Sequence, residues 1–120
     1  MVNTPTSVTR VAIAGATGFA GQEVVRILAR HPAVSLVVAM SSAATSAPRP
    51  LPALARIWDD PVVPLDIDRL IAETDIVFLA LPEAASAEVA PKLLAGGRTV
   101  IDLSGAYRIR DDEQIGRAHV

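Results

Sequence analysis

The sequence contains no cysteine. A chain without thiols forms no disulfide, and it offers neither a thiolate ligand for a metal nor a cysteine nucleophile for covalent catalysis. We therefore predict no metal site with thiolate ligands within these 120 residues. A reaction that needs a thiolate must take it from outside this sequence.

Aromatic residues and excess charge are also scarce. Phe, Trp and Tyr make up 3% of the chain, and the formal net charge is −2 with no basic cluster. An aliphatic composition suits a parallel sheet covered on both faces, and the lack of a basic patch argues against a nucleic-acid partner. No apolar run approaches the roughly 20 residues of a membrane span, and the polar start from Met1 to Arg10 has no signal-peptide pattern. We expect a cytoplasmic protein with no membrane partner.

Apolar strands alternate with helical segments along the chain. The hydrophobic pattern predicts strands at Val11–Ala14, Val34–Met40, Ile76–Ala80 and Thr99–Leu103, and helices at Gln22–Arg30, Asp66–Glu73 and Ser86–Ala95. This alternation predicts an α/β fold with a Rossmann-like doubly wound parallel sheet, incomplete here with about four strands. We expect one truncated domain over residues 8–114, after a flexible N-terminus at residues 1–7.

Prolines leave two segments less regular. Ser41 to Pro64 is a long connection, and a short helical turn is expected near Leu54–Trp58. Pro91 lies inside the last predicted helix, which therefore either kinks or begins only near Ala90.

A glycine motif is the most informative pattern in the sequence. Gly15-Ala16-Thr17-Gly18-Phe19-Ala20-Gly21 follows the first predicted strand and opens the first predicted helix. In that context the first glycine allows a sharp turn, the second lets backbone approach a pyrophosphate, and the third lets helix and strand pack closely. The N–H groups at the helix start favour an anion. We predict an NAD(P)-binding site here.

The second predicted strand ends without an acidic residue. An Asp or Glu at this place usually holds the ribose 2′-OH of NAD, but the sequence has no acidic residue between Glu23 and Asp59. Ser41 and Ser42 stand there instead, and small hydroxyls are suited to a 2′-phosphate. These residues favour NADP, and Arg49 is the nearest arginine that follows the strand.

The remaining polar loops follow the third and fourth strands. Because carboxyl ends of parallel strands meet at one edge, we expect four loops to converge: Gly15–Gly21, Ser41–Ser42, Leu81–Ser86 and Asp102–Arg110. Asp102 is suited to anchoring its loop by accepting backbone N–H bonds. Arg108 and Arg110 suit either an anionic substrate or pairing with neighbouring aspartates. Glu83 and Glu88 are interpreted as surface carboxylates.

Three segments in this order resemble N-acetyl-γ-glutamyl-phosphate reductases, which are relatives of aspartate-semialdehyde dehydrogenases. They are the glycine motif, Val77-Phe78-Leu79-Ala80-Leu81-Pro82, and Ile101-Asp102-Leu103-Ser104-Gly105-Ala106-Tyr107-Arg108. The likeness covers about Val8 to Gln114, and the last segment is the most specific. It implies the NADP-binding half of such an enzyme.

The resemblance also implies a reaction. NADPH reduces an acyl phosphate to an aldehyde through a thioester on a catalytic cysteine, with a histidine as acid and base, in an enzyme expected to be a homo-oligomer. Neither catalytic residue is matched, since the sequence has no cysteine and His31 and His119 fit no catalytic position. We expect these residues to bind cofactor without catalysing the reaction alone.

The implied cofactor contacts fall on the converging loops. Pyrophosphate contacts are expected from Gly15, Ala16, Thr17, Gly18 and Phe19. Ser41 and Ser42 are expected to face the adenosine ribose, and Leu81, Pro82 and Ser104 the nicotinamide side.

The chain departs from the family pattern at two places. Glu83-Ala84 replaces the His-Gly that often follows the loop proline. The last six residues, Ile115 to Val120, match one reading frame of a common sequencing adapter, so we expect a non-native tail there.

Three alternatives use the same glycine motif. An aspartate-semialdehyde dehydrogenase would share the chemistry. A short-chain dehydrogenase or epimerase would need a Tyr-x-x-x-Lys pair, whereas the only tyrosine, Tyr107, is followed by Asp111 at that spacing. A stand-alone nucleotide-binding module is the non-enzymatic alternative.

Overall fold

A computed structural model describes residues 8–44 and 47–104 of the chain. The predicted N-terminal segment, the loop residues from Gly105 to Arg110 and the predicted non-native tail lie outside these residues. The elements in chain order are β1 (Thr9–Ala14), α1 (Phe19–Ala29), β2 (Val34–Met40), the 3-10 turn η1 (Pro52–Leu54), α2 (Ile67–Glu73), β3 (Ile76–Leu79), α3 (Glu83–Ala95) and β4 (Thr99–Asp102).

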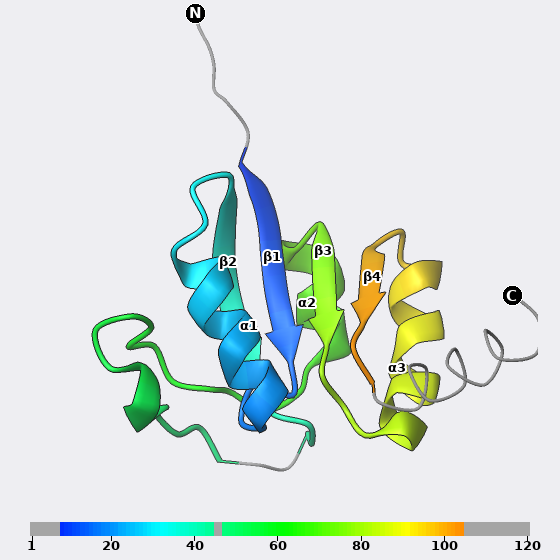
Figure 1. The fold of residues 1–120 in the computed structure, drawn as a ribbon. Helices are drawn as coiled ribbons and strands as arrows, with labels where there is room; N and C mark the ends of the chain where they lie inside the picture. The colour runs from blue at the N-terminus through cyan, green and yellow to red at the C-terminus, as the bar shows by residue number, and fades with distance from the viewer. Residues whose placement is uncertain (1–7, 45–46, 105–120) are drawn as a thin grey trace, which may run out of the picture.

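The described strands form one parallel sheet in the order β2-β1-β3-β4 (Figure 1). The chain moves from β1 outward to β2 and then returns to the other side of β1 for β3. This reversal makes the gap between β1 and β3 the switch point, where open α/β sheets bind ligands beside the carboxyl ends of their strands. The predicted Rossmann-like doubly wound sheet is confirmed.

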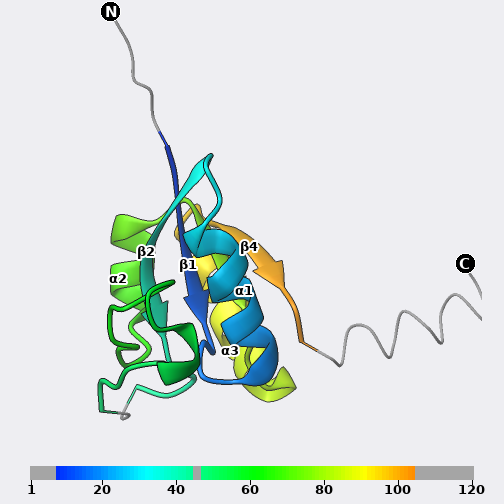
Figure 2. The same cartoon turned by 60° about the vertical axis from the view of Figure 1, so that its left-hand side comes forward.

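Both faces of the sheet are covered. Figure 2 shows α1 and α2 on opposite sides of the strands. One buried cluster joins the sheet to α2 and α3, and it includes Ala12, Met40, Leu70, Val77, Leu79, Val89 and Leu93. The other joins the opposite face to α1 and to the long connection, and it includes Ile13, Val25, Ala39, Leu51, Leu54 and Val62. Aliphatic side chains fill both layers, as the low aromatic content predicts.

Two helices begin earlier than predicted. Helix α1 begins at Phe19 rather than Gln22, so Gly21 lies inside it although glycine is a poor helix former. Helix α3 begins at Glu83 rather than Ser86, because Pro82 precedes it with a fixed φ of −56° and Ala84 and Ala85 favour helix.

Pro91 neither starts nor ends α3. It lies inside the helix, where its missing N–H leaves the carbonyl of Ala87 without a helical partner. Both residues are exposed, so water can satisfy that carbonyl.

The long connection is more ordered than its proline content suggests. Its helical turn is η1 at Pro52–Leu54, slightly before the predicted Leu54–Trp58. Val62 exchanges backbone hydrogen bonds with Arg49, and Val63 bridges to Met40 at the end of β2. The connection is therefore fastened to the same sheet edge as the glycine motif. None of the helices in residues 8–44 and 47–104 combines the length and apolar character needed to cross a bilayer.

Candidate nucleotide-binding site

The glycine loop turns sharply at the end of β1. Gly15 has a φ of +93°, and a Cβ built there would lie 2.7 Å from the carbonyl carbon of Ala80. The N–H groups of Gly15 and Ala16 both donate to the carbonyl oxygen of Met40, at 2.8 and 2.9 Å. Only glycine fits this turn without strain, and the turn ties β1 to the end of β2.

The other two glycines differ in what surrounds them. A Cβ built on Gly21 would lie 2.9 Å from Cα of Ala16 and closer still to the carbonyl oxygen of Gly15, so the helix passes directly against the loop. A Cβ built on Gly18 would meet no protein atom nearer than 3.9 Å. Gly21 is thus required by protein packing, whereas the space at Gly18 is open to a ligand.

The first turn of α1 presents unpaired donors. Gly18 is its N-cap and supplies no side-chain cap, and the N–H of Gln22 makes the first helical bond to the carbonyl of Gly18 at 2.9 Å. Among the described residues, the N–H groups of Phe19, Ala20 and Gly21 have no acceptor. Free donors at the positive end of a helix dipole bind anions such as phosphate.

A cavity of about 290 Å³ joins this turn to the ends of β3 and β4. Its walls are Gly18, Phe19, Ala20, Gly21, Ala80, Leu81, Leu103 and Ser104. The structure therefore brings together residues from three of the predicted loops, at the switch point of the sheet. Phe19 is 86% exposed, an unusual position for an aromatic side chain.

Asp102 anchors the loop after β4, as predicted. Its Oδ1 accepts a hydrogen bond from the Ser104 N–H at 2.8 Å and from the Ser86 hydroxyl at 3.3 Å. Oδ2 of Asp102 and the hydroxyl oxygen of Ser104 are buried and have no partner in the described part of the chain. The sequence placed Ser86 at the end of the converging Leu81–Ser86 loop but gave no sign of its bond to Asp102, and the structure places it inside α3.

Leu81 and Pro82 differ in burial, and of these two predicted cofactor contacts Leu81 alone lines the cavity. Leu81 is buried and lines the cavity, whereas Pro82 is exposed and caps the start of α3. Glu83 is exposed, as its interpretation as a surface carboxylate predicts, and begins the helix. Arg108 and Arg110 lie outside the described residues, so their predicted alternatives stay open.

The two serines after β2 have different surroundings. Ser41 is buried, its N–H donates to the carbonyl of Val63 at 2.8 Å, and its hydroxyl donates to the carbonyl of Ala43 at 3.0 Å. Ser42 is exposed. The hydroxyl of Ser41 therefore serves the loop itself, and Ser42 is the serine accessible to a ligand.

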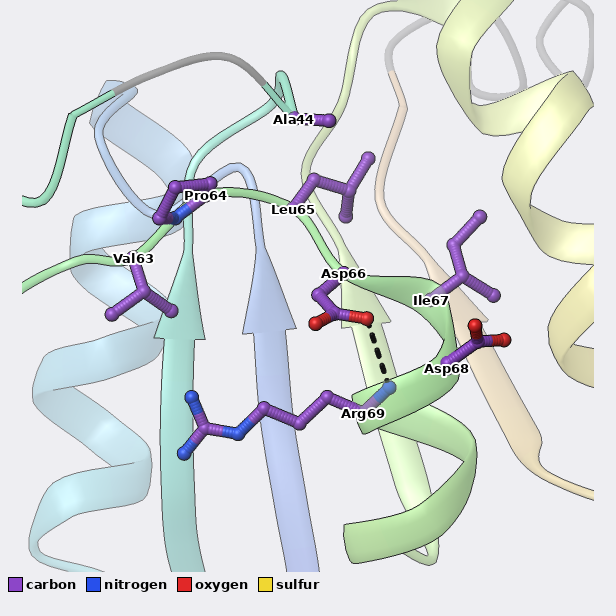
Figure 3. Close-up of a pocket in the computed structure, with 8 residues that line it drawn as sticks. All are labelled: Ala44, Val63, Pro64, Leu65, Asp66, Ile67, Asp68 and Arg69. Atoms are coloured by element: carbon purple, nitrogen blue, oxygen red, sulfur yellow. Dashed lines mark hydrogen bonds between the residues drawn. The ribbon is translucent and has the colours of Figure 1, made fainter.

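A larger cavity, of about 560 Å³, lies at the start of α2 (Figure 3). Its walls are Ala44, Val63, Pro64, Leu65, Asp66, Ile67, Asp68 and Arg69. Asp66 caps its own helix by accepting the Arg69 N–H at 3.1 Å, and the Arg69 side chain is paired with Glu73 at 3.0 Å. The carboxylates of Asp66 and Asp68 and the paired Arg69 side chain disfavour a phosphate here, so the smaller cavity is the better candidate for a nucleotide site.

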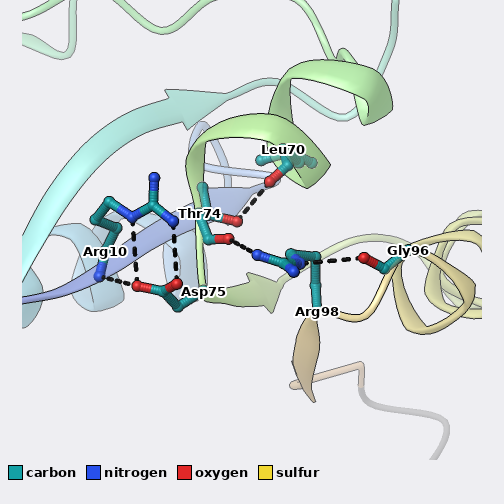
Figure 4. Close-up of polar contacts among 6 residues, drawn as sticks. All are labelled: Arg10, Leu70, Thr74, Asp75, Gly96 and Arg98. Atoms are coloured by element: carbon teal, nitrogen blue, oxygen red, sulfur yellow. Dashed lines mark hydrogen bonds and ion pairs between the residues drawn. The ribbon is translucent and has the colours of Figure 1, made fainter.

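Polar contacts at the amino ends of the strands, opposite the glycine loop, stabilise the fold (Figure 4). Asp75 accepts from the backbone and the guanidinium of Arg10, and the ion pair measures 3.1 Å. The side-chain hydrogen bond from Arg10 lowers the pKa of Asp75 below its ordinary value. Arg98 donates to the carbonyl of Thr74 at 2.6 Å. These groups lie at the amino ends of the strands, away from the glycine loop.

Comparison with known proteins gives the same family as the motifs. The model of the semialdehyde dehydrogenase NAD-binding domain matches residues 10–120. N-acetyl-γ-glutamyl-phosphate reductase from Syntrophobacter fumaroxidans is 44% identical over 104 residues, and that from Bacillus subtilis is 40% identical. Each match covers 85% of this chain but only 30% of the relative.

A solved structure shares the fold. Aspartate semialdehyde dehydrogenase from Candida albicans, determined with NADP, superposes with a TM-score of 0.66 at 23% identity and covers 85% of this chain and 31% of that one. At this identity the likeness concerns the fold alone. The predicted resemblance is confirmed, and the chain belongs to the semialdehyde dehydrogenase NAD-binding domain family.

Proposed function

We propose that residues 8–114 form the NADP-binding domain of an N-acetyl-γ-glutamyl-phosphate reductase. The observation that carries this proposal is the cavity between the first turn of α1 and the ends of β3 and β4, in a chain 44% identical to such a reductase. The chain spans 30% of that relative's length, and the reaction is proposed for the whole enzyme.

The glycine loop fits a dinucleotide pyrophosphate. The open space at Gly18 admits phosphate oxygens, and the unpaired N–H groups of Phe19 and Ala20 are donors for them. Gly15, Ala16 and Thr17 complete the loop, and Gly15 and Ala16 are held rigidly by the Met40 carbonyl. A rigid cradle loses little conformational entropy when it binds, which favours affinity.

The nicotinamide half of the cofactor fits the cavity beyond this loop. Leu81 offers it a buried apolar wall, and Ser104 offers a hydroxyl without a protein partner among the described residues. Asp102 holds Ser104 in position by accepting a hydrogen bond from the Ser104 backbone N–H. Pro82 stiffens the neighbouring loop at the start of α3.

NADP rather than NAD is favoured by the end of β2. Met40-Ser41-Ser42 supplies no carboxylate to hold a free 2′-OH or to repel a 2′-phosphate. Ser42 is the exposed hydroxyl available there. The structural neighbour from Candida albicans was determined with NADP, and the proposal extends that cofactor to this chain.

This chain and the rest of the enzyme are proposed to carry different parts of the reaction. Bound NADPH supplies a hydride. The chain holds and orients the cofactor, and because it contains no cysteine, the acyl thioester forms on a thiol elsewhere in the enzyme. The chain alone is expected to bind NADP without reducing an acyl phosphate.

The test is an assay of the enzyme encoded by the gene that contains this chain. We expect NADPH oxidation with N-acetyl-γ-glutamyl phosphate and little with aspartyl phosphate. Preference for aspartyl phosphate would instead identify an aspartate-semialdehyde dehydrogenase. Turnover of neither acyl phosphate, together with NADP binding, would indicate a nucleotide-binding module.

A further inference from the structure

A second cavity lies on the other side of the glycine loop. It measures about 420 Å³ and is lined by Thr17, Gln22, Arg49, Pro50, Leu51 and Pro52. The first cavity adjoins β3 and β4, whereas this one adjoins the long connection, which bridges back to the end of β2. A dinucleotide spans a switch point with its adenosine half on the β2 side. The second cavity is therefore the one that faces the adenosine ribose.

We propose that Arg49 binds the 2′-phosphate of NADP and sets the preference for NADP over NAD. This inference rests on the proposed function, since it concerns the same nucleotide. It adds a charged contact from the middle of the long connection to the hydroxyl that Ser42 offers directly after β2.

The backbone of Arg49 is fixed in place by the connection. Its N–H donates to the carbonyl of Val62 at 3.0 Å, and the N–H of Val62 donates back at 2.7 Å. Val63 in turn donates to the carbonyl of Ala39 at 3.0 Å, inside β2. Leu51, two residues after Arg49, is buried in the core beneath α1. A residue held this way keeps its position beside the glycine loop.

The guanidinium of Arg49 is unpaired in the described structure. Arg10, Arg26 and Arg69 each form an ion pair with a carboxylate, whereas no described carboxylate pairs with Arg49. The residues that line its cavity include no acid. An uncompensated guanidinium suits a phosphate, with which it forms bidentate charged hydrogen bonds.

The other side of the cavity offers a hydroxyl. The Gln22 side chain donates to the carbonyl of Thr17 at 2.9 Å and holds the rim of the loop. The Thr17 hydroxyl has no hydrogen-bond partner among the described residues. Thr17 and Arg49 thus face one space from two segments far apart in the sequence.

The experiment measures dissociation constants for NADP+ and NAD+ by calorimetry on the full 120-residue chain. Arg49→Gln removes the charge, and Arg49→Lys keeps it without the bidentate geometry. Arg30→Gln is the matched control, because Arg30 is an exposed arginine with no ion pair in the described structure, at the far end of α1. Far-UV circular dichroism verifies that each variant keeps the wild-type fold.

For Arg49→Gln we expect NADP+ affinity to fall by about tenfold or more, and NAD+ affinity to change by less than about twofold. Arg49→Lys is expected to lie between wild type and Arg49→Gln, and Arg30→Gln to match wild type. An equal loss for both dinucleotides, or no loss, overturns the role of Arg49 while leaving NADP binding intact. A wild-type chain that binds neither dinucleotide overturns both the inference and the proposed function.

Discussion

Replacing Gly18 by alanine separates ligand binding from folding at the glycine loop. The backbone at Gly18 is extended, with φ of −78° and ψ of 171°, which any residue adopts. The added methyl group would meet no protein atom nearer than 3.9 Å. The variant should therefore fold normally and place its methyl group in the space proposed for the pyrophosphate.

The magnitudes follow from these contacts. Gly→Ala in a compatible conformation stabilises by about 0.4–1 kcal/mol, and alanine is a poorer N-cap than glycine by about the same amount. The two effects offset, so Gly18→Ala should change the free energy of unfolding by less than about 1 kcal/mol. For NADP+ we expect affinity to fall at least about tenfold, or about 1.4 kcal/mol.

Gly21→Ala is the matched comparison. Its methyl group would press on Cα of Ala16, at 2.9 Å, and on the carbonyl of Gly15. Overpacking costs about 1–3 kcal/mol, against about 1 kcal/mol gained in helix propensity. We expect Gly21→Ala to be less stable than Gly18→Ala.

Urea unfolding and calorimetric titration with NADP+ measure the two effects on the same proteins. A Gly18→Ala variant that binds NADP+ as tightly as wild type refutes the proposal that the pyrophosphate occupies the space beside Gly18. A Gly18→Ala variant that is as destabilised as Gly21→Ala refutes the distinction between the two glycines.

Two further predictions concern stability. The Arg10 hydrogen bond lowers the pKa of Asp75, so the Arg10–Asp75 pair stabilises the fold above the ordinary carboxyl range and stops doing so as the pH falls through the lowered pKa. Asp75→Asn should therefore be less stable than wild type at neutral pH. In urea unfolding, this difference in stability should disappear in acid. A deficit that is equal at both pH values would contradict the ion pair as its source. Asp102→Ala leaves the buried Ser104 N–H without its acceptor, so thermal unfolding should show a loss of about 1–3 kcal/mol in the free energy of unfolding. Ser86→Ala should cost less, because the bond from Ser86 to Asp102 is longer, at 3.3 Å. Equal losses in the two variants would show that the Ser104 contact adds nothing.

The strands and the glycine turn could be predicted because their signals are local. Val11–Ala14 and Val34–Met40 are nearly continuous aliphatic runs, as strands buried on both faces require. Gly15 follows directly, and its φ of +93° is the conformation that glycine uniquely tolerates. Asp102 could be predicted as a loop anchor for the same reason, since its partner Ser104 is two residues away.

The start of α1 was predicted wrongly because propensity and packing conflict there. The apolar stripe of this segment begins at Val24 and predicted a start at Gln22, and glycine is a poor helix former, so the pattern left Gly21 outside the helix. The structure needs a residue without a side chain at Gly21, where the helix passes the Gly15 carbonyl. The requirement arises from a contact between separate segments, and helix propensity carries no information about it.

The position of Arg49 could not be predicted from the sequence. It depends on pairing between Arg49 and Val62 and between Met40 and Val63, across a proline-rich stretch. Such bridges follow no hydrophobic period, so the sequence indicates only a long loop. Ser41 shows the same limit for its backbone, since its N–H donates to the distant Val63 carbonyl, whereas its hydroxyl makes a local bond to the Ala43 carbonyl.

We expect a nicotinamide dinucleotide to bind beside the glycine loop, where the carboxyl ends of the strands meet. Backbone amide NMR of the chain during titration with NADP+ checks this placement residue by residue, because it reports which amides respond. We predict shifts concentrated at Thr17–Gly21, Leu81 and Ser104, with the start of α2 unchanged. Shifts concentrated at Leu65–Arg69, in the cavity of Figure 3, or no shifts at saturating NADP+, would rule out binding at the glycine loop.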